Sequence, residues 1–260
     1  MSNTFEVVGK LDSVFDSMRV AQPLDILSEA ECDNTVMMRL QAFNESNKKG
    51  MIVIEQKDMP AMIDSGDIYK MSNGGIMFPD NMIYNNVNIR EVVDTIPESK
   101  IVVAGKKPAP EKHSPILYNC LLVGCKLPDG SMVEGGAVIG SDKYRSFIGG
   151  NSLLKDTLMA GQVATNKNCM IVDCEVTDGA RMGVQNKFYS NHSYGSKNAK
   201  FEAESVIIGG RHTGAVFDDG VQIVDCTPEN YKEIVESFKE HVTSVAIDEA
   251  LSNEYKGLSS

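Results

Sequence analysis

The chain has 260 residues, of which 42% are hydrophobic, and a formal net charge of −11. These values are typical of a globular protein with one large core or two moderate ones, and they exclude a disordered or fibrous class. The acidic balance argues against nucleic acid and anionic membranes as partners, because both attract a basic surface. No apolar run reaches the roughly 18 residues that span a membrane. Residues 1–6 lack the basic and apolar regions of a signal peptide.

The first hundred residues differ from the rest and predict a small domain over residues 1–104, α+β or mostly β, with α+β preferred. Residues 11–18 carry apolar side chains at helical spacing, and Pro23 follows them. Residues 35–40 and 51–55 predict strands, joined by an exposed polar turn at 44–50. Two further short strands are expected at 76–78 and 100–104.

A proline-rich segment marks a domain boundary. Residues 105–115 contain three prolines and no apolar pattern. Such a composition predicts an extended, fairly stiff linker. We therefore expect a second domain to begin at residue 116.

A recurring heptapeptide organises the second domain. The sequence NCLLVGC at residues 119–125 recurs as NCMIVDC at 168–174 and in part as VQIVDC at 221–226. Around these copies, apolar runs too short for helices alternate with Gly, Asn and Asp, which tolerate the positive φ of tight corners. This pattern predicts a parallel β-solenoid over residues 116–226, in which similar residues stack at equal positions of successive coils. Cys120 and Cys169 lie 49 residues apart, enough for two long or three short coils.

The segment from Asn168 to Gly179 resembles one coil of the right-handed parallel β-helices of the pectate-lyase and phage-tailspike type. The resemblance covers residues 116–226 and implies a ladder of stacked strands. The tailspike members imply a virion or assembly component that self-associates, whereas the lyases imply an enzyme acting on carbohydrate. The long series of coils in those families is absent here. The left-handed hexapeptide acyltransferases are a second comparison, although this chain lacks a sustained six-residue repeat.

The cysteines allow two interpretations. The spacing C-x4-C, found twice, is marginally compatible with zinc, but each pair lies within an apolar run with no His beside it. Buried free thiols are the preferred interpretation, so we expect no metal and no cofactor. Free cysteines without an export signal favour synthesis and folding in a reducing cytoplasm. The six cysteines are Cys32, Cys120, Cys125, Cys169, Cys174 and Cys226.

Two polar groups are candidates for chemistry if the chain is an enzyme. Asp173 and Glu175 alternate on one expected strand, so both would point to the same face, and Asp178 follows in the turn. The β-helix resemblance implies a use for this cluster in Ca²⁺ binding or acid catalysis, and the alternative is a solvated outer face. Arg211 and His212, in a Gly-rich stretch, can hold a carboxylate or phosphate, or simply form an exposed turn.

Two other groups are candidates for interactions. Phe188, Tyr189 and Tyr194 lie in a polar loop, where aromatic rings either grip a partner or pack beneath the loop. Thr227 and Pro228 begin a predicted amphipathic helix that covers the open end of the solenoid or packs in an oligomer. Its apolar stripe consists of Tyr231, Ile234, Phe238, Val242 and Val245.

The expected architecture is mostly β, a short parallel β-solenoid with an N-terminal α+β domain, and a C-terminal capping helix and tail at 227–260. We expect a structural or interaction protein, cytoplasmic at synthesis, with incorporation into a virion as the tailspike resemblance implies. Its expected partners are further copies of itself, as a homo-oligomer, and other assembly proteins. A carbohydrate-acting lyase or hydrolase, and a left-handed solenoid acyltransferase, are the alternatives.

Overall fold

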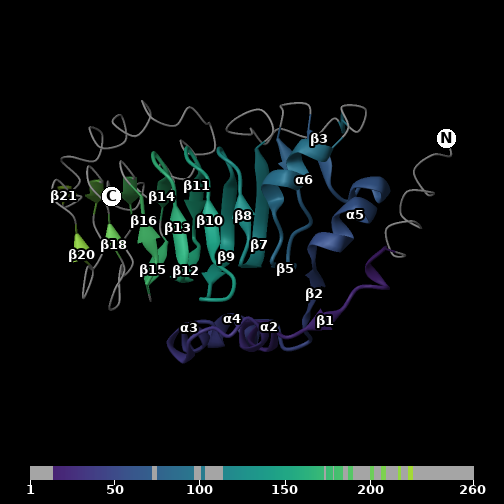
Figure 1. Cartoon of the computed structure of the whole chain (residues 1–260), viewed down its shortest axis with the longest axis horizontal. Coiled ribbons are helices and arrows are strands. Elements are labelled where there is room, and N and C mark those ends of the chain that lie inside the picture. The colour runs from purple at the N-terminus through teal and green to yellow at the C-terminus, as the bar shows by residue number, and fades with distance from the viewer. Residues whose placement is uncertain are drawn as a thin grey trace, which may run out of the picture.

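The computed structural model is mostly β, with a parallel β-solenoid of about four turns and an N-terminal α+β region (Figure 1). This arrangement confirms the predicted fold class. The predicted C-terminal helix lies outside the described residues. The structure describes residues 14–71, 75–96, 114–172, 174–177 and 179–183, together with strand backbone at 101–102, 187–189, 200–201, 206–208, 216–217 and 222–224.

Each turn of the solenoid places short strands on three faces. The first face stacks the first halves of β7 and β9 with β11, β14, β17, β19 and β21. The second face stacks the second halves of β7 and β9 with β12 and β15, and the third face stacks β8, β10, β13, β16, β18 and β20. Leu117 pairs with Val133, which pairs with Leu154, so successive turns take 16 and 21 residues; the next takes 17.

The strands of the solenoid have these bounds: β7 Pro115–Val123, β8 Lys126–Leu127, β9 Met132–Gly140, β10 Ser146–Ile148, β11 Leu153–Lys155, β12 Leu158–Gly161, β13 Val163–Thr165, β14 Met170–Val172, β15 Glu175–Thr177 and β16 Arg181–Met182. The ladders continue through β17 Lys187–Tyr189, β18 Lys200–Phe201, β19 Val206–Ile208, β20 Val216–Phe217 and β21 Gln222–Val224.

The corners between faces explain many of the Gly, Asn and Asp residues. Between the first and second faces, Asn119, Gly135 and Asp156 adopt φ values of 51°, 74° and 48°. These residue types tolerate the left-handed region, which a tight corner requires. The corner between the third and first faces repeats this conformation at Gly130, Asn151 and Asn168.

A small residue follows the left-handed residue at these corners, and it is buried at all of them except Gly136. Ser152 Oγ donates a hydrogen bond to Gly149 O at 2.8 Å and accepts one from Ser131 N at 3.1 Å. Cys169 occupies the position of Ser152 one turn later, and its Sγ lies 3.3 Å from Gly149 O. Cys169 therefore fills a corner position that serine fills in the preceding turn.

The two full copies of the heptapeptide lie on different faces. Residues 121–123 of the first copy belong to the second face, whereas residues 170–172 of the second copy belong to the first face. Cys120 stacks on Gly136 and, by the same register, shares its corner with Cys174 rather than Cys169. The 49 residues between Cys120 and Cys169 are therefore not a whole number of turns, contrary to the interpretation as two or three coils, because the motif repeats with each corner and strand, and three such units make one turn.

The outer side of the second face is covered by helices α2 Pro23–Glu29, α3 Asn34–Arg39 and α4 Gln41–Ser46, which lie along one side of the ladder (Figure 1). Inward residues such as Val138 and Met159 share one core cluster. The alternate residues Leu121 and Ile139 pack outward with Leu27 of α2 in a second cluster. No helix in the described ranges is long and apolar enough to cross a membrane.

The parallel ladder continues into the N-terminal region. There β5 pairs with the second half of β7, β2 pairs with β5, and β4 pairs with the start of β7. Strand β1 pairs antiparallel with β2, and β3 pairs antiparallel with β4. These pairings protect the backbone edges of β2 and β4 at this end of the ladder. Met62 and Val92, from α5 and α6, join the inward core cluster. The boundary predicted at 105–115 stays a prediction, because residues 103–113 lie outside the described part of the chain.

The remaining elements have these bounds: β1 Val20–Ala21, β2 Met51–Ile54, η1 Gln56–Asp58, α5 Met59–Ser65, β3 Tyr69–Met71, β4 Ile76–Met77, β5 Ile83–Asn85, α6 Ile89–Thr95 and β6 Ile101–Val102. The strands predicted at 51–55, 76–78 and 100–104 are thereby confirmed, each within one or two residues of its expected ends.

The strand predicted at 35–40 is wrong, because these residues form most of α3. Asp33 caps this helix, accepting a hydrogen bond from Thr35 N at 2.7 Å. Val36 and Leu40 lie about one helical turn apart and are buried against the second face. The exposed turn predicted at 44–50 is also wrong at its start, since α4 extends through Ser46.

Candidate functional site

Glu175 is the only described residue of the predicted acidic cluster. Its strand β15 begins after β14 has ended at Val172, and the buried Cys174 lies at the corner between them. The interpretation that Asp173 and Glu175 alternate on one strand stays a prediction. The Glu175 carboxylate lies 3.3 Å from the Arg39 guanidinium of α3, with both side chains about 40% exposed. Asp173 itself lies outside the described residues.

The other residues predicted for chemistry or interaction are not brought together in the described part of the chain. Phe188 and Tyr189 lie in β17 on the first face, where only the backbone is described. The remaining predicted residues lie outside the described ranges: Asp178, Tyr194, Arg211, His212, Tyr231, Ile234, Phe238, Val242 and Val245.

The cysteines of the heptapeptides are structural. Cys120, Cys125, Cys169 and Cys174 are free and buried, which confirms the prediction for these four; Cys226 lies outside the described residues. Burial raises the pKa of the first three to about 12. A thiol that keeps its proton is a poor nucleophile and a poor metal ligand.

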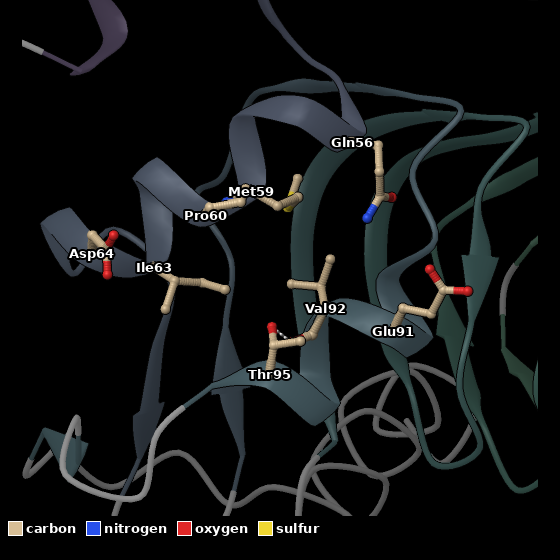
Figure 2. Close-up of a pocket in the computed structure, with 8 residues that line it drawn as sticks. All are labelled: Gln56, Met59, Pro60, Ile63, Asp64, Glu91, Val92 and Thr95. Atoms are coloured by element: carbon tan, nitrogen blue, oxygen red, sulfur yellow. Dashed lines mark hydrogen bonds between the residues drawn. The ribbon is translucent and has the colours of Figure 1, made fainter.

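A small cavity of about 360 Å³ lies between α5 and α6 (Figure 2). Ile63 and Val92 face each other across it, while Asp64 and Glu91 lie at opposite ends. Gln56 Oε1, at its rim, accepts a hydrogen bond from Asn88 N at 2.7 Å. The centre of this cavity is apolar, and its two carboxylates do not converge, so it offers no concentrated polar site.

A larger cavity, of about 660 Å³, lies beside the N-terminal turn of the ladder. We call it the Asp67 cavity. Its walls include the turn before β3, the chain at and after β4, and part of β7. It is lined by Phe15, Gly66, Asp67, Tyr69, Met77, Phe78, Pro79, Asp80, Met82 and Tyr118.

The backbone around Pro79 positions one wall of the Asp67 cavity. The buried Tyr84 hydroxyl donates a hydrogen bond to Pro79 O at 2.8 Å, and the Tyr84 ring packs edge-on against Phe78 at 6.0 Å between centroids. Burial raises the pKa of Tyr84 well above its usual value, with smaller contributions from the thiols of Cys120 and Cys125 and the carboxylates of Asp80 and Asp67. The protonated hydroxyl therefore acts as a fixed donor that holds the Pro79 turn in place.

Asp67 is the unusual residue of this cavity. Its side chain is 7% exposed. The Ser65 hydroxyl donates to Oδ2, but Oδ1 is buried and has no hydrogen-bond partner. A buried carboxylate oxygen without a partner is costly, and native structures rarely tolerate one without a reason.

Charge and aromatic character distinguish the Asp67 cavity from the cavity between α5 and α6. Among its lining residues, Asp67 and Asp80 carry negative charge and none carries positive charge. Phe15, Tyr69 and Tyr118 are half-buried and present ring surface. Within the described residues, no three His, Cys, Asp or Glu side chains are grouped closely enough to hold a metal ion.

Sequence reasoning missed this cavity because its residues come from separate segments. Asp80 lies in a Pro-Asp-Asn turn signal, and Asp67 follows Gly66 at the C-terminal end of a helix, where Asp is a common turn residue. Neither position carries a pattern that would have identified a site. Asp67 and Asp80 line the same cavity because β3 and β4 both join the first-face ladder.

Comparisons of this chain with known protein families, with curated proteins and with solved structures find no match.

Proposed function

We propose that this chain is a structural, interaction-based protein that self-associates through the third face of its solenoid. The observation that carries the proposal is the exposure of this face beside two covered ones. Outward residues of the second face pack beneath α2–α4. Outward residues of the first face, Ile116, Met132, Leu153 and Met170, are also buried.

The third face presents a flat sheet with a mixed apolar and basic surface. Lys126, Phe147, Ala164 and Arg181 stack on successive rungs. Phe147 is 41% exposed, and both basic residues are exposed. Since the chain as a whole has a net charge of −11, acidic surface on a second copy is complementary to these rungs.

Stacked parallel strands suit a structural role. Each turn contacts only its neighbours, so the array forms a rigid rod whose surface repeats at a regular spacing. The buried hydroxyls and thiols at the described corners bond to backbone atoms of the same or neighbouring turns and do not converge on a cleft. By resemblance to tailspike-type solenoids, we propose a virion or assembly component as the setting, with other assembly proteins as further partners. Glu175, the described residue of the predicted acidic cluster, is paired with Arg39, so this cluster does not favour the carbohydrate-acting alternative.

The test is light scattering coupled to size exclusion, across a range of protein concentrations. We expect the wild type to form an oligomer and Phe147→Asp to give a smaller soluble species, because the change places a charge in the apolar centre of the contact. Since Phe147 is partly exposed, the dissociated protein should stay folded, and its melting temperature should fall only by the stabilisation that association gives the wild type.

The matched control is Met38→Asp, at a 60% exposed apolar residue on α3. It should leave the oligomer intact. A wild type that is monomeric at all concentrations, or an oligomer that is indifferent to Phe147→Asp, would contradict the proposal.

A further inference from the structure

We propose that the Asp67 cavity is a binding site for an organic cation: a primary ammonium group on an apolar stem, supplied by a free amine or by a lysine side chain of a partner. The site lies at the N-terminal end of the ladder, away from the third face. The inference is therefore independent of the proposed self-association.

The first argument is the unsatisfied carboxylate. Asp67 Oδ1 is buried without a hydrogen-bond partner, while Ser65 occupies only Oδ2. An ammonium group offers three N–H donors and a positive charge, so it would satisfy this oxygen and neutralise the buried carboxylate together. A neutral donor would supply the hydrogen bond but not the charge.

The second argument is the character of the walls. Phe15, Tyr69 and Tyr118 present aromatic rings, whose faces attract cations. Met77 and Met82 add flexible apolar surface for an alkyl stem. Asp80 is exposed and adds a second negative charge, which favours entry of a cation and opposes entry of an anion.

The third argument is the choice between an organic cation and a metal ion. Hard cations such as Ca²⁺ take about 6–8 oxygen ligands, mostly from carboxylates and carbonyls. Asp67 and Asp80 are the only two carboxylates among the lining residues, and most of the remaining wall is aromatic or thioether. The volume of about 660 Å³ falls within the range of roughly 300–1,000 Å³ that small organic ligands occupy.

The test is isothermal titration calorimetry of the full chain with n-hexylammonium, using n-hexanol as the neutral probe of the same shape. We expect hexylammonium to bind and hexanol to bind at least tenfold more weakly. Asp67→Asn should weaken hexylammonium binding by at least tenfold. Asp80→Asn, at an exposed position that folding does not need, should weaken it severalfold.

The matched control is Asp94→Asn, at an exposed carboxylate on α6 outside the cavity, which should leave the affinity unchanged. A short blocked peptide containing lysine, compared with the same peptide containing norleucine, distinguishes the two sources. Tighter binding of the lysine peptide than of hexylammonium indicates a partner protein, and the reverse indicates a free amine. Equal binding of hexanol and hexylammonium, no binding of either cationic probe, or unchanged affinity in both Asp67→Asn and Asp80→Asn would overturn the proposal.

Discussion

The corner serine Ser152 gives the sharpest test of how the turns are held together. Its side chain is fully buried, and its hydroxyl bonds both Gly149 O and Ser131 N, which belong to adjacent turns. Ser152→Ala removes both bonds and leaves the Ser131 N–H buried without a partner, whereas Gly149 O keeps the Cys169 thiol at 3.3 Å. An orphaned buried N–H costs about 1–3 kcal/mol, so we expect a loss of about 2 kcal/mol of unfolding free energy. For a chain of this size, that loss lowers the melting temperature by about 4–8 °C.

The assay is urea unfolding followed by circular dichroism, with thermal melts as a second measurement. Ser28→Ala, at an exposed position on α2, is the control and should change stability by less than about 0.5 kcal/mol. Ser152→Cys should lower the unfolding free energy less than Ser152→Ala does. Cys169 fills the same corner one turn later with its thiol near Gly149 O, so a thiol fits this position. If Ser152→Ala is as stable as the wild type, the corner hydrogen bonds do not hold the turns together.

Two further predictions concern the thiols and the first face. Burial raises the pKa of Cys120, Cys125 and Cys169 from 9.0 to about 12, so the unfolded thiols ionise first and stability should fall as the pH rises from 9 to 12. Cys169→Ser should lessen this fall in a series of melts against pH, and native thiols should label slowly; rapid labelling of all of them would contradict their burial. As a helix, the predicted stripe at 231–245 would extend about 21 Å, which fits within the roughly 29 Å that the seven rungs of the first face span. Leu153→Asp and Phe238→Asp should therefore destabilise the protein non-additively, as a double-mutant cycle of melting temperatures would measure, whereas additive losses would show that the two sites do not touch.

Local rules account for the corners and the thiols. An Asn, Asp or Gly before a small residue, followed by a short apolar run, predicts a tight corner and a buried strand wherever it occurs. Asn119 and Asn168 both obey this rule, although they lie at different corners of the solenoid. The same local sequence pattern forms corners and strands on different faces, so the sequence did not indicate which face each copy of the heptapeptide occupies.

The segment at 35–40 shows the opposite case. Its short apolar run fits a strand as well as a helix, and its branched and sulfur-containing side chains do not decide between the two. The outer side of the second face offers an apolar surface that a helix covers with Val36 and Leu40 on one stripe, so tertiary packing made the choice.

The sequence by itself determined the stacked strands, the left-handed corners and the burial of the heptapeptide thiols, because each depends on residues adjacent in the chain. Only the tertiary structure decided that the N-terminal strands extend the same ladder, that α2–α4 cover one face, and that Asp67 and Asp80 line one cavity. Those features depend on pairings between segments far apart in the sequence, such as β4 with β7, whose register no local pattern specifies.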